Sequence, residues 1–171
     1  REYVRAKVAG DPMRDGARVN LPAIWGTAIG DVVEAAMRAA HPDVVRTQFD
    51  VDYMLHVGGR DMKVTGHGDV LMGRKLLIDL KTKDGLTTAE REGGSDKERI
   101  QVSIYLLGLI SMGLLDEDAE AFLVFIDRSG RERRMVGSGI TAEQACEWVA
   151  VAEDRLLDVA NALAAGVSQG Y

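Results

Sequence analysis

The sequence has 171 residues, which is enough for one domain around a single core and too few for two ordinary domains. Its residues are 46% hydrophobic and 28% charged without a long apolar run, which predicts a soluble globular protein and excludes a membrane span. The formal net charge of −6 argues mildly against nucleic acid as a partner, because phosphate binding normally needs basic residues. Carboxylates that bind a divalent cation weaken this argument, since the ion reverses the local charge.

Cysteine use and charge clusters narrow the possibilities further. Cys146 is the only cysteine, so this chain alone cannot build a disulfide, a thiolate zinc site or an iron–sulfur cluster. With no secretory segment, we expect a cytoplasmic protein. Basic residues gather in two places, where they either contact nucleic acid or are ordinary solvated charges. They are Arg74, Lys75, Lys81 and Lys83, and then Arg128, Arg131, Arg133 and Arg134.

The first half of the chain predicts a helix followed by three strands. Residues 21–40 form the helix, with Pro22 near its start and His41 and Pro42 at its end. Its apolar residues recur at helical spacing. Residues 44–57, 62–72 and 75–83 are rich in β-branched residues and alternate in polarity, which predicts three consecutive antiparallel strands. The helical apolar stripe comprises Trp25, Ile29, Val32, Val33 and Ala36.

The second half begins with a polar, glycine-containing stretch over residues 84–94, which predicts an exposed loop. A helix over residues 95–113 opens with a capping box of Ser95 and Glu98. Residues 121–126 and 133–138 are two further strands, joined by a turn at residues 129–130. A second capping box, of Thr141 and Gln144, opens a last helix that runs to residue 165. The order α-β-β-β-α-β-β-α predicts an α/β protein with a mixed, mostly antiparallel sheet in a single domain over residues 1–171.

The second and third strands place three charged residues on one face. Asp79 and Lys81 are two residues apart, so they share a face. A three-residue hairpin loop at residues 73–75 pairs Met72 with Leu76 and brings Asp69 opposite Asp79. A two-residue loop would mix polar with apolar side chains, so the apolar pattern itself selects the register. One face then carries Val70, Met72, Leu76, Ile78 and Leu80, and the other carries Asp69, Asp79 and Lys81.

Two opposed carboxylates repel each other unless a cation lies between them. Magnesium takes oxygen ligands and keeps several waters, so Asp69, Asp79 and the backbone carbonyl of Leu80 suit Mg²⁺ or Mn²⁺. Such an ion acidifies a bound water and stabilises charge on a phosphate, while Lys81 orients the water and neutralises phosphate oxygens. The alternative is that Lys81 only pairs with Asp79 or reaches solvent and that Asp69 merely ends a strand, because short motifs carry a real false-positive risk.

Three motifs appear in order: Gly66-His-Gly-Asp69, then Asp79-Leu-Lys81, then Gln101-Val-Ser-Ile-Tyr105. Together they resemble the PD-(D/E)XK nuclease superfamily, in its RecB-like, phage-type exonuclease branch, whose relatives include CRISPR-associated adaptation nucleases. The resemblance spans roughly residues 26–105. It implies a restriction-endonuclease-like core, hydrolysis of DNA phosphodiesters, metal ligands at Asp69 and Asp79, and a catalytic Lys81.

The same resemblance implies that Gln101 and Tyr105 lie beside the active site. They are one helical turn apart and therefore share a face, where the Gln101 amide would hold a group of the catalytic loop or a DNA phosphate. The alternative for both residues is ordinary surface or half-buried packing.

The first helix departs from the family pattern. Members of this branch often carry a metal-binding histidine at the position of Gly30. Glu34 lies one turn further along the same face, and either supplies the missing oxygen ligand or faces solvent. The three histidines His41, His56 and His67 are expected to be structural or surface groups.

Relatives often add an iron–sulfur cluster, which Cys146 alone cannot hold. Because the sequence begins at Arg1 and not at a methionine, we expect a trimmed chain, and flanking segments that would carry such a cluster stay an open alternative.

The leading hypothesis is a metal-dependent DNA exonuclease that acts at DNA ends in recombination or repair, of the kind that phages encode. Its partners would be DNA and either a recombination protein or further copies of the chain, and no membrane. The second hypothesis, prompted by Gly30, is a nuclease-fold DNA-binding or assembly module that has lost catalysis. The third is an unrelated α/β protein with a chance motif, which fails if Asp69 and Asp79 are neighbours in space.

Overall fold

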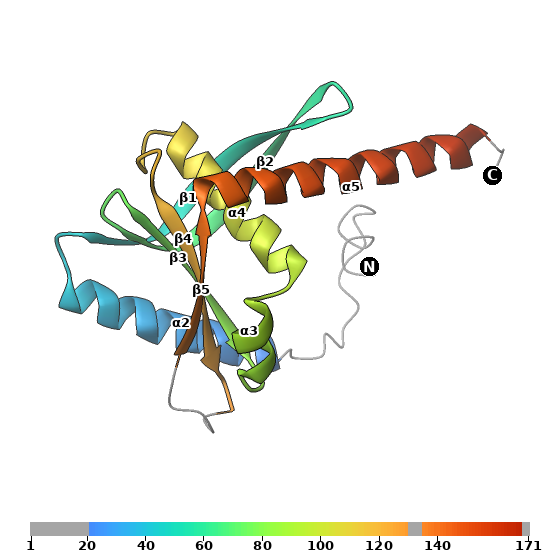
Figure 1. Cartoon of the computed structure of the whole chain (residues 1–171). Coiled ribbons are helices and arrows are strands. Elements are labelled where there is room, and N and C mark those ends of the chain that lie inside the picture. The colour runs from blue at the N-terminus through green and yellow to red at the C-terminus, as the bar shows by residue number, and fades with distance from the viewer. Residues whose placement is uncertain (1–20, 130–134, 169–171) are drawn as a thin grey trace, which may run out of the picture.

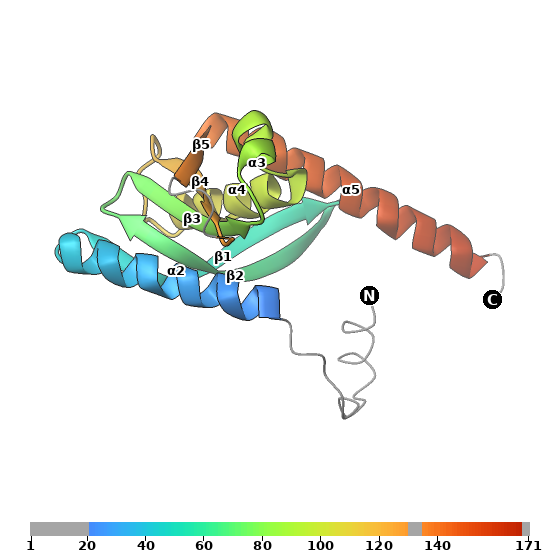
Figure 2. The same cartoon turned by 90° about the horizontal axis from the view of Figure 1, so that it is seen from below.

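The computed structural model describes residues 21–129 and 135–168, which form three layers with a five-stranded sheet in the middle (Figure 1). Helix α2 (Leu21–Ala40) covers one face of the sheet. Helices α3 (Thr87–Glu92), α4 (Asp96–Ser111) and α5 (Ala142–Ser168) lie on the other face (Figure 2). In spatial order the strands are β1 (Val45–Val57), β2 (Arg60–Met72), β3 (Leu76–Lys83), β4 (Glu120–Asp127) and β5 (Met135–Thr141).

The sheet is mixed, as the sequence predicts. Strands β1, β2 and β3 are antiparallel neighbours, β3 and β4 are parallel, and β4 and β5 are antiparallel. Helices α3 and α4 form the crossover between the parallel pair, because parallel neighbours cannot be joined by a tight turn. The predicted first helix, the first three strands and the antiparallel order among those strands are confirmed.

Both predicted capping boxes are confirmed. At the start of α4, the Ser95 hydroxyl accepts from the Glu98 backbone, and the Glu98 carboxylate accepts from the Ser95 N–H at 2.9 Å. At the start of α5, the Thr141 N–H donates to the Gln144 side chain at 3.0 Å, and the Gln144 N–H donates to the Thr141 hydroxyl at 3.3 Å. These caps satisfy N–H groups that a helix start leaves unpaired.

The predicted loop at residues 84–94 is wrong in part, because it contains the short helix α3. Leu86 is fully buried and Ala89 is buried, so apolar contacts hold this segment on the core despite its polar composition. Gly93, with a φ of 66°, ends the helix in the left-handed conformation that favours glycine. The predicted turn residue Gly130 and residues 133–134 of the predicted fifth strand lie outside the described residues.

Two apolar clusters lie on opposite faces of the sheet. The larger packs the sheet against α4 and α5 and includes Leu71, Leu77, Leu123 and Phe125. In the smaller, the buried residues Val45, Val70 and Ile78 contact Met37 of α2. Met72, Leu76 and Leu80 pack against the smaller cluster, which confirms the predicted apolar face of the β2–β3 hairpin.

The predicted apolar stripe of α2 is partly wrong. Val32 is 69% exposed and Ala36 is also exposed, whereas Glu34 is 4% exposed and Met37 packs against the sheet. A glutamate therefore occupies the buried face of this helix where the apolar periodicity favoured valine and alanine.

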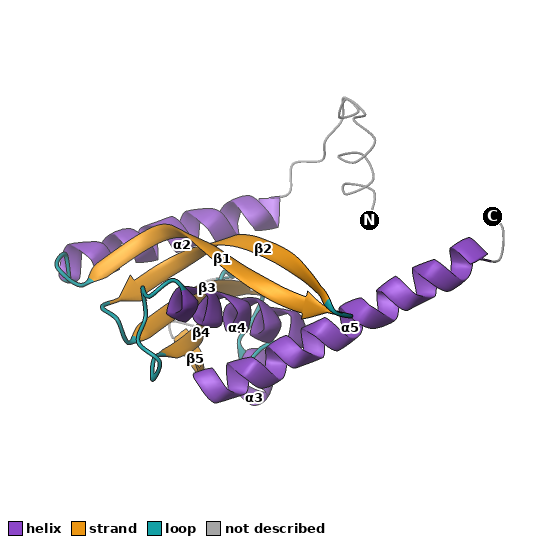
Figure 3. Ribbon diagram, turned by 90° about the horizontal axis from the view of Figure 1, so that it is seen from above, coloured by secondary structure: helices purple, strands orange, loops and turns teal. Residues whose placement is uncertain are grey.

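Helix α5 is the longest helix, and its second half extends beyond the sheet (Figure 3). Leu156, Val159 and Leu163 are exposed along that half. No helix in the described ranges has both the length and the apolar character needed to cross a bilayer.

Candidate active site

The hairpin between β2 and β3 has the predicted register. Met72 pairs with Leu76, and the ladder continues through Leu71 with Leu77 and Val70 with Ile78, where it stops. Strand β2 goes on pairing with β1 alone. The strands β2 and β3 therefore diverge directly beside Asp69, and the acidic residues predicted to be opposed lie at this fork.

Asp69 closes the end of the ladder with its side chain. Its Oδ2 accepts a hydrogen bond from the Leu80 backbone N–H at 2.7 Å. Burial raises the pKa of Asp69, while the Leu80 hydrogen bond and the charge of Lys81 act in the opposite direction. The Asp69 carboxylate thus accepts the hydrogen bond that a backbone carbonyl of the neighbouring strand would accept, and it lies close to Lys81.

Asp79 is 2% exposed and lies deepest in the site. The Lys81 Nζ is 2.7 Å from Asp79 Oδ2, yet this buried oxygen receives no well-directed hydrogen bond from the described part of the chain. Burial raises the pKa of Asp79 to about 6, against the opposing effect of Lys81, and the charge of Asp69 raises it further. Asp69 and Asp79 are therefore neighbours in space, which overturns the chance-motif hypothesis on its own criterion.

A chain of polar contacts leads from Lys81 to α4. Lys81 Nζ donates to Gln101 Oε1 at 3.3 Å, and Gln101 Nε2 donates to the Tyr105 hydroxyl at 3.1 Å. Tyr105 is 9% exposed. The predicted common face of Gln101 and Tyr105 is confirmed, and Gln101 contacts the lysine directly. Their roles in catalysis stay predictions.

The two glycines of the first motif have a steric reason. A Cβ at Gly66 would lie 2.5 Å from the Tyr105 hydroxyl oxygen, and a Cβ at Gly68 would lie 2.3 Å from the Phe49 ring. Both contacts are far closer than real Cβ atoms allow, so aromatic rings occupy the space in which side chains would stand. The motif thus lets Tyr105 approach β2.

Glu34 reaches the site from α2. Gln48 Nε2 donates to its Oε1 at 2.8 Å. Burial raises the pKa of Glu34, Gln48 opposes this effect, and the charges of Asp69 and Asp31 add to it. The alternative in which Glu34 faces solvent is therefore wrong.

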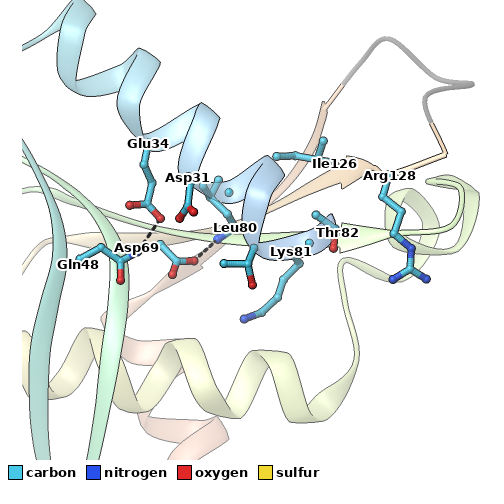
Figure 4. Close-up of a pocket in the computed structure, with 12 residues that line it drawn as sticks. Asp31, Glu34, Gln48, Asp69, Leu80, Lys81, Thr82, Ile126 and Arg128 are labelled. Atoms are coloured by element: carbon cyan, nitrogen blue, oxygen red, sulfur yellow. Dashed lines mark hydrogen bonds between the residues drawn. The ribbon is translucent and has the colours of Figure 1, made fainter. Parts of the chain in front are cut away.

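Glu34, Asp69 and Lys81 line a cavity of about 530 Å³ between α2 and the sheet. Figure 4 shows Asp31, Glu34, Gln48 and Asp69 together at one end, Lys81 between the ends with its ammonium toward the acids, and Arg128 at the other end. Gly26 and Gly30 also line it, and a Cβ at Gly30 would meet no atom of the described residues within 4 Å. The cavity combines an acidic end, suited to a cation, with Lys81 beside it and Arg128 farther away, which suit phosphate.

Asp31, Gln48 and Arg128 are among the cavity residues that were not assigned to a site from the sequence. Asp31 lies three residues before Glu34, so helical spacing would have found it. Arg128 belongs to one of the two basic groups, but the sequence does not indicate which residues of these groups line the cavity. Gln48 gave no sequence signal, because its direction depends on an unusual backbone angle.

Arg128 lines the cavity and also pairs with Asp84. Most of the other basic residues lie outside the cavity and pair with acids of the same chain. Arg74 contacts Asp116, Lys75 contacts Asp118, and Lys83 contacts Glu98 at 2.5 Å. For these lysines and arginines the solvated-charge alternative is favoured over a role in nucleic-acid binding. Arg131, Arg133 and Arg134 lie outside the described residues.

The donor set fits a hard cation that keeps part of its water shell. Within the described ranges, no three histidine, cysteine or acidic side chains come close enough together to form a metal-ligand group by themselves. Asp79 Oδ2 is buried with the Lys81 ammonium 2.7 Å away, and its remaining lone pair is an acceptor that a cation would satisfy. Asp69, Glu34 and the Leu80 carbonyl add oxygen donors at the same cavity, which suits Mg²⁺ or Mn²⁺ better than a softer metal.

No protein-family model and no curated protein matches the sequence. Among solved structures, the crystal structure of SSO0001 matches with a TM-score of 0.60 and 20% identity, over 91% of this chain and 66% of that one. A second match is a protein of Eubacterium rectale that is named as a provisional exonuclease. Its TM-score is 0.55 at 14% identity, over 94% of this chain and 74% of that one. The chain shares their fold.

That likeness supports the predicted fold class, an α/β protein with a mixed sheet between helices, which the element order confirms. At 14% to 20% identity it shows the fold alone. The chain spans about two thirds (66%) of the length of SSO0001. The resemblance to a particular nuclease branch, which rests on the three motifs, therefore stays a prediction.

Proposed function

We propose that this chain is a metal-dependent nuclease that hydrolyses phosphodiester bonds in DNA. The observation that carries the proposal is the buried Asp79, ion-paired with Lys81 and beside Asp69, at the fork between β2 and β3. Burial of a carboxylate is costly, so a buried acid next to a second acid at a cavity is a strong candidate for chemistry.

The cation belongs at the acidic end of the cavity. Asp69, Asp79 and the Leu80 carbonyl would hold Mg²⁺ or Mn²⁺, with Glu34 as a further ligand from α2. When bound, the ion would supply an acidified water and would neutralise charge on the phosphate. The protein holds these oxygens on two strands and one helix, so their positions follow from the packing of α2 on the sheet.

Lys81 has the geometry of a phosphate-binding group. An ammonium carries three N–H donors. One points toward Asp79 at 2.7 Å and one donates to Gln101 at 3.3 Å, which leaves one for a phosphate oxygen or the attacking water. Gln101 and Tyr105 then keep the lysine in place. Arg128, which lines the same cavity and pairs with Asp84, would contact a neighbouring phosphate of the strand.

The finer features of the proposal rest on the motif resemblance. Action at DNA ends, a role in recombination or repair, a phage origin, and a partner protein or further copies of the chain are all expectations of this kind. The Eubacterium rectale protein, named for exonuclease activity, supports the proposal through its shared fold.

A DNA-binding or assembly module without catalysis is the second candidate, and Gly30 favours it. The space beside Gly30 is open in the described structure, so no imidazole completes the site there. This candidate predicts that DNA binds without being cleaved and that Mn²⁺ does not raise the melting temperature.

Labelled linear DNA with Mg²⁺ or Mn²⁺ tests the proposal. We expect wild type to cleave this DNA. Asp79→Ala and Lys81→Ala should each reduce the cleavage rate by about 10²- to 10³-fold, because each removes a charge that acts on the reacting groups. Lys63→Ala is the matched control, since Lys63 is an exposed lysine paired with Asp52 away from the cavity. Circular DNA in parallel separates action at ends from internal cleavage. Equal activity of wild type, Asp79→Ala and Lys81→Ala would contradict the assignment.

A further inference from the structure

Gln48 has a backbone conformation that its residue type disfavours. Its φ is 54°, and it is the only non-glycine residue with a positive φ among the described residues. A side chain with a Cβ crowds its own backbone there, whereas glycine adopts this region freely. Such a conformation persists only where the surrounding structure holds it, and it concentrates at functional sites.

Strand β1 changes face at this residue. Val45 belongs to the cluster under α2, whereas Phe49 belongs to the cluster on the opposite face of the sheet. In a regular strand, residues four apart point to the same side. The register between β1 and β2 is the same before and after Gln48, with Thr47 opposite Val70 and Phe49 opposite Gly68. At the position between these pairs, Gln48 and Asp69 are not paired. The left-handed residue therefore turns the strand over at the point where it faces Asp69.

The turned strand directs the Gln48 side chain into the cavity. There its Nε2 donates to Glu34 Oε1 at 2.8 Å, and Gln48, Glu34 and Asp69 all line the acidic end (Figure 4). Glycine would adopt the same backbone angle without strain but has no amide to donate. The side chain, and not the backbone, therefore explains a glutamine at this position.

We propose that Gln48 is a positioning residue, which holds the carboxylate of Glu34 in the orientation that a divalent cation beside Asp69 requires. The inference rests on the proposed function, because Glu34 needs a fixed orientation only if the cavity holds a cation. Glu34 comes from a helix, whereas Asp69 and Asp79 come from the sheet. The Gln48 amide joins these two elements at the site itself.

The affinity for Mn²⁺ alone, measured by calorimetric titration of metal-free protein without DNA, tests this role. We expect Gln48→Gly to weaken Mn²⁺ binding roughly tenfold, as for other residues that orient a metal ligand. Without metal, the unfolding midpoint should change little, because relief of backbone strain by glycine offsets the hydrogen bond that buried Glu34 loses. Gln48→Asn, which tolerates the left-handed region but has a shorter side chain, should weaken Mn²⁺ binding similarly and serves as a second variant.

Asp50→Gly is the matched control. It places glycine in the same strand at an exposed residue that pairs with His67 and does not line the cavity. It should show the reverse pattern, with unchanged Mn²⁺ affinity and a lower unfolding midpoint, because glycine weakens a strand interior.

A double-variant cycle completes the test. In a Glu34→Gln background, Gln48→Gly should have no further effect on Mn²⁺ binding, because the carboxylate that it orients is gone. A full tenfold loss in that background, or equal affinity of wild type and Gln48→Gly, overturns the role of Gln48 and leaves the proposed function standing. A wild type that binds no Mn²⁺ overturns both.

Discussion

The Leu80 backbone N–H donates to Asp69 Oδ2 at 2.7 Å, across the fork at which β2 and β3 diverge. A side-chain carboxylate thus replaces the backbone carbonyl that would continue the ladder. Asp69 therefore has two separable roles: it satisfies a strand N–H, and its charge lies beside Lys81 and Asp79.

Substitutions of Asp69 should separate these roles. Asp69→Asn keeps an oxygen that accepts from Leu80, so we expect a small change in stability together with loss of Mn²⁺ binding. Asp69→Ala leaves the Leu80 N–H without its acceptor and should lower the free energy of unfolding by roughly 1 to 3 kcal/mol. Urea denaturation of both metal-free variants checks this difference. Equal destabilisation by Asn and Ala would show that the hydrogen bond contributes nothing to stability.

The stability of the metal-free protein should fall as the pH rises from about 4 to 6. Burial raises the pKa of Asp79 from 3.8 to about 6, so between these values the folded state holds a proton that the unfolded state releases. The stabilisation is therefore complete below the unfolded pKa and is lost as the pH passes the folded pKa. It amounts to roughly 3 kcal/mol. Burial raises the pKa of Asp69 and Glu34 in the same direction.

The free energy of unfolding, measured against pH in a chelating buffer, checks the effect of Asp79. The fall should be much smaller in Asp79→Asn, which has no titrating group at this position. Bound Mn²⁺ should reverse the trend in wild type, because a cation favours the charged carboxylate. Identical pH profiles for the two metal-free proteins would show that Asp79 titrates normally.

Two glycines of α2 should respond oppositely to alanine. A Cβ at Gly26 would lie 2.8 Å from Thr82 Oγ1, whereas a Cβ at Gly30 would meet open space in the described structure. We expect Gly26→Ala to lower the free energy of unfolding by about 1 to 3 kcal/mol through overpacking. Gly30→Ala should raise it by up to about 1 kcal/mol, because alanine favours the helix. Thr82→Ala should rescue Gly26→Ala, and a failure to rescue would place the clash elsewhere.

Arg128 should contribute to DNA binding, and Lys75 should not. Arg128 lines the cavity and pairs with Asp84, whereas Lys75 lies outside the cavity and pairs with Asp116 and Asp118. We expect Arg128→Ala to weaken binding to all DNA sequences and to reduce the salt dependence of affinity by about one unit of slope. Lys75→Ala is the matched control, with unchanged slope. Binding isotherms at several salt concentrations, with Ca²⁺ in place of Mg²⁺, measure both. A reduced slope for Lys75→Ala alone would place the DNA outside the cavity.

Much of the fold follows from local signals. The capping boxes at Ser95 and Thr141 mark helix starts, because the side chain that caps a helix lies within three residues of the group that it satisfies. Helix α3 was not predicted because five of its six residues are polar, and it is held by the burial of Leu86 and Ala89. That burial depends on distant segments of the chain.

The sequence alone was enough to place Asp79 and Lys81 on one strand face and to select the hairpin register that brings Asp69 beside them. Side-chain alternation and a three-residue loop are local properties, so they can be read without the rest of the chain. Only the tertiary structure decided that Glu34 is buried at the same cavity and that Gln48 points at it. The packing of α2 on the sheet and a single left-handed residue determine these two features. Neither produces a periodic pattern in the sequence from which it could be predicted.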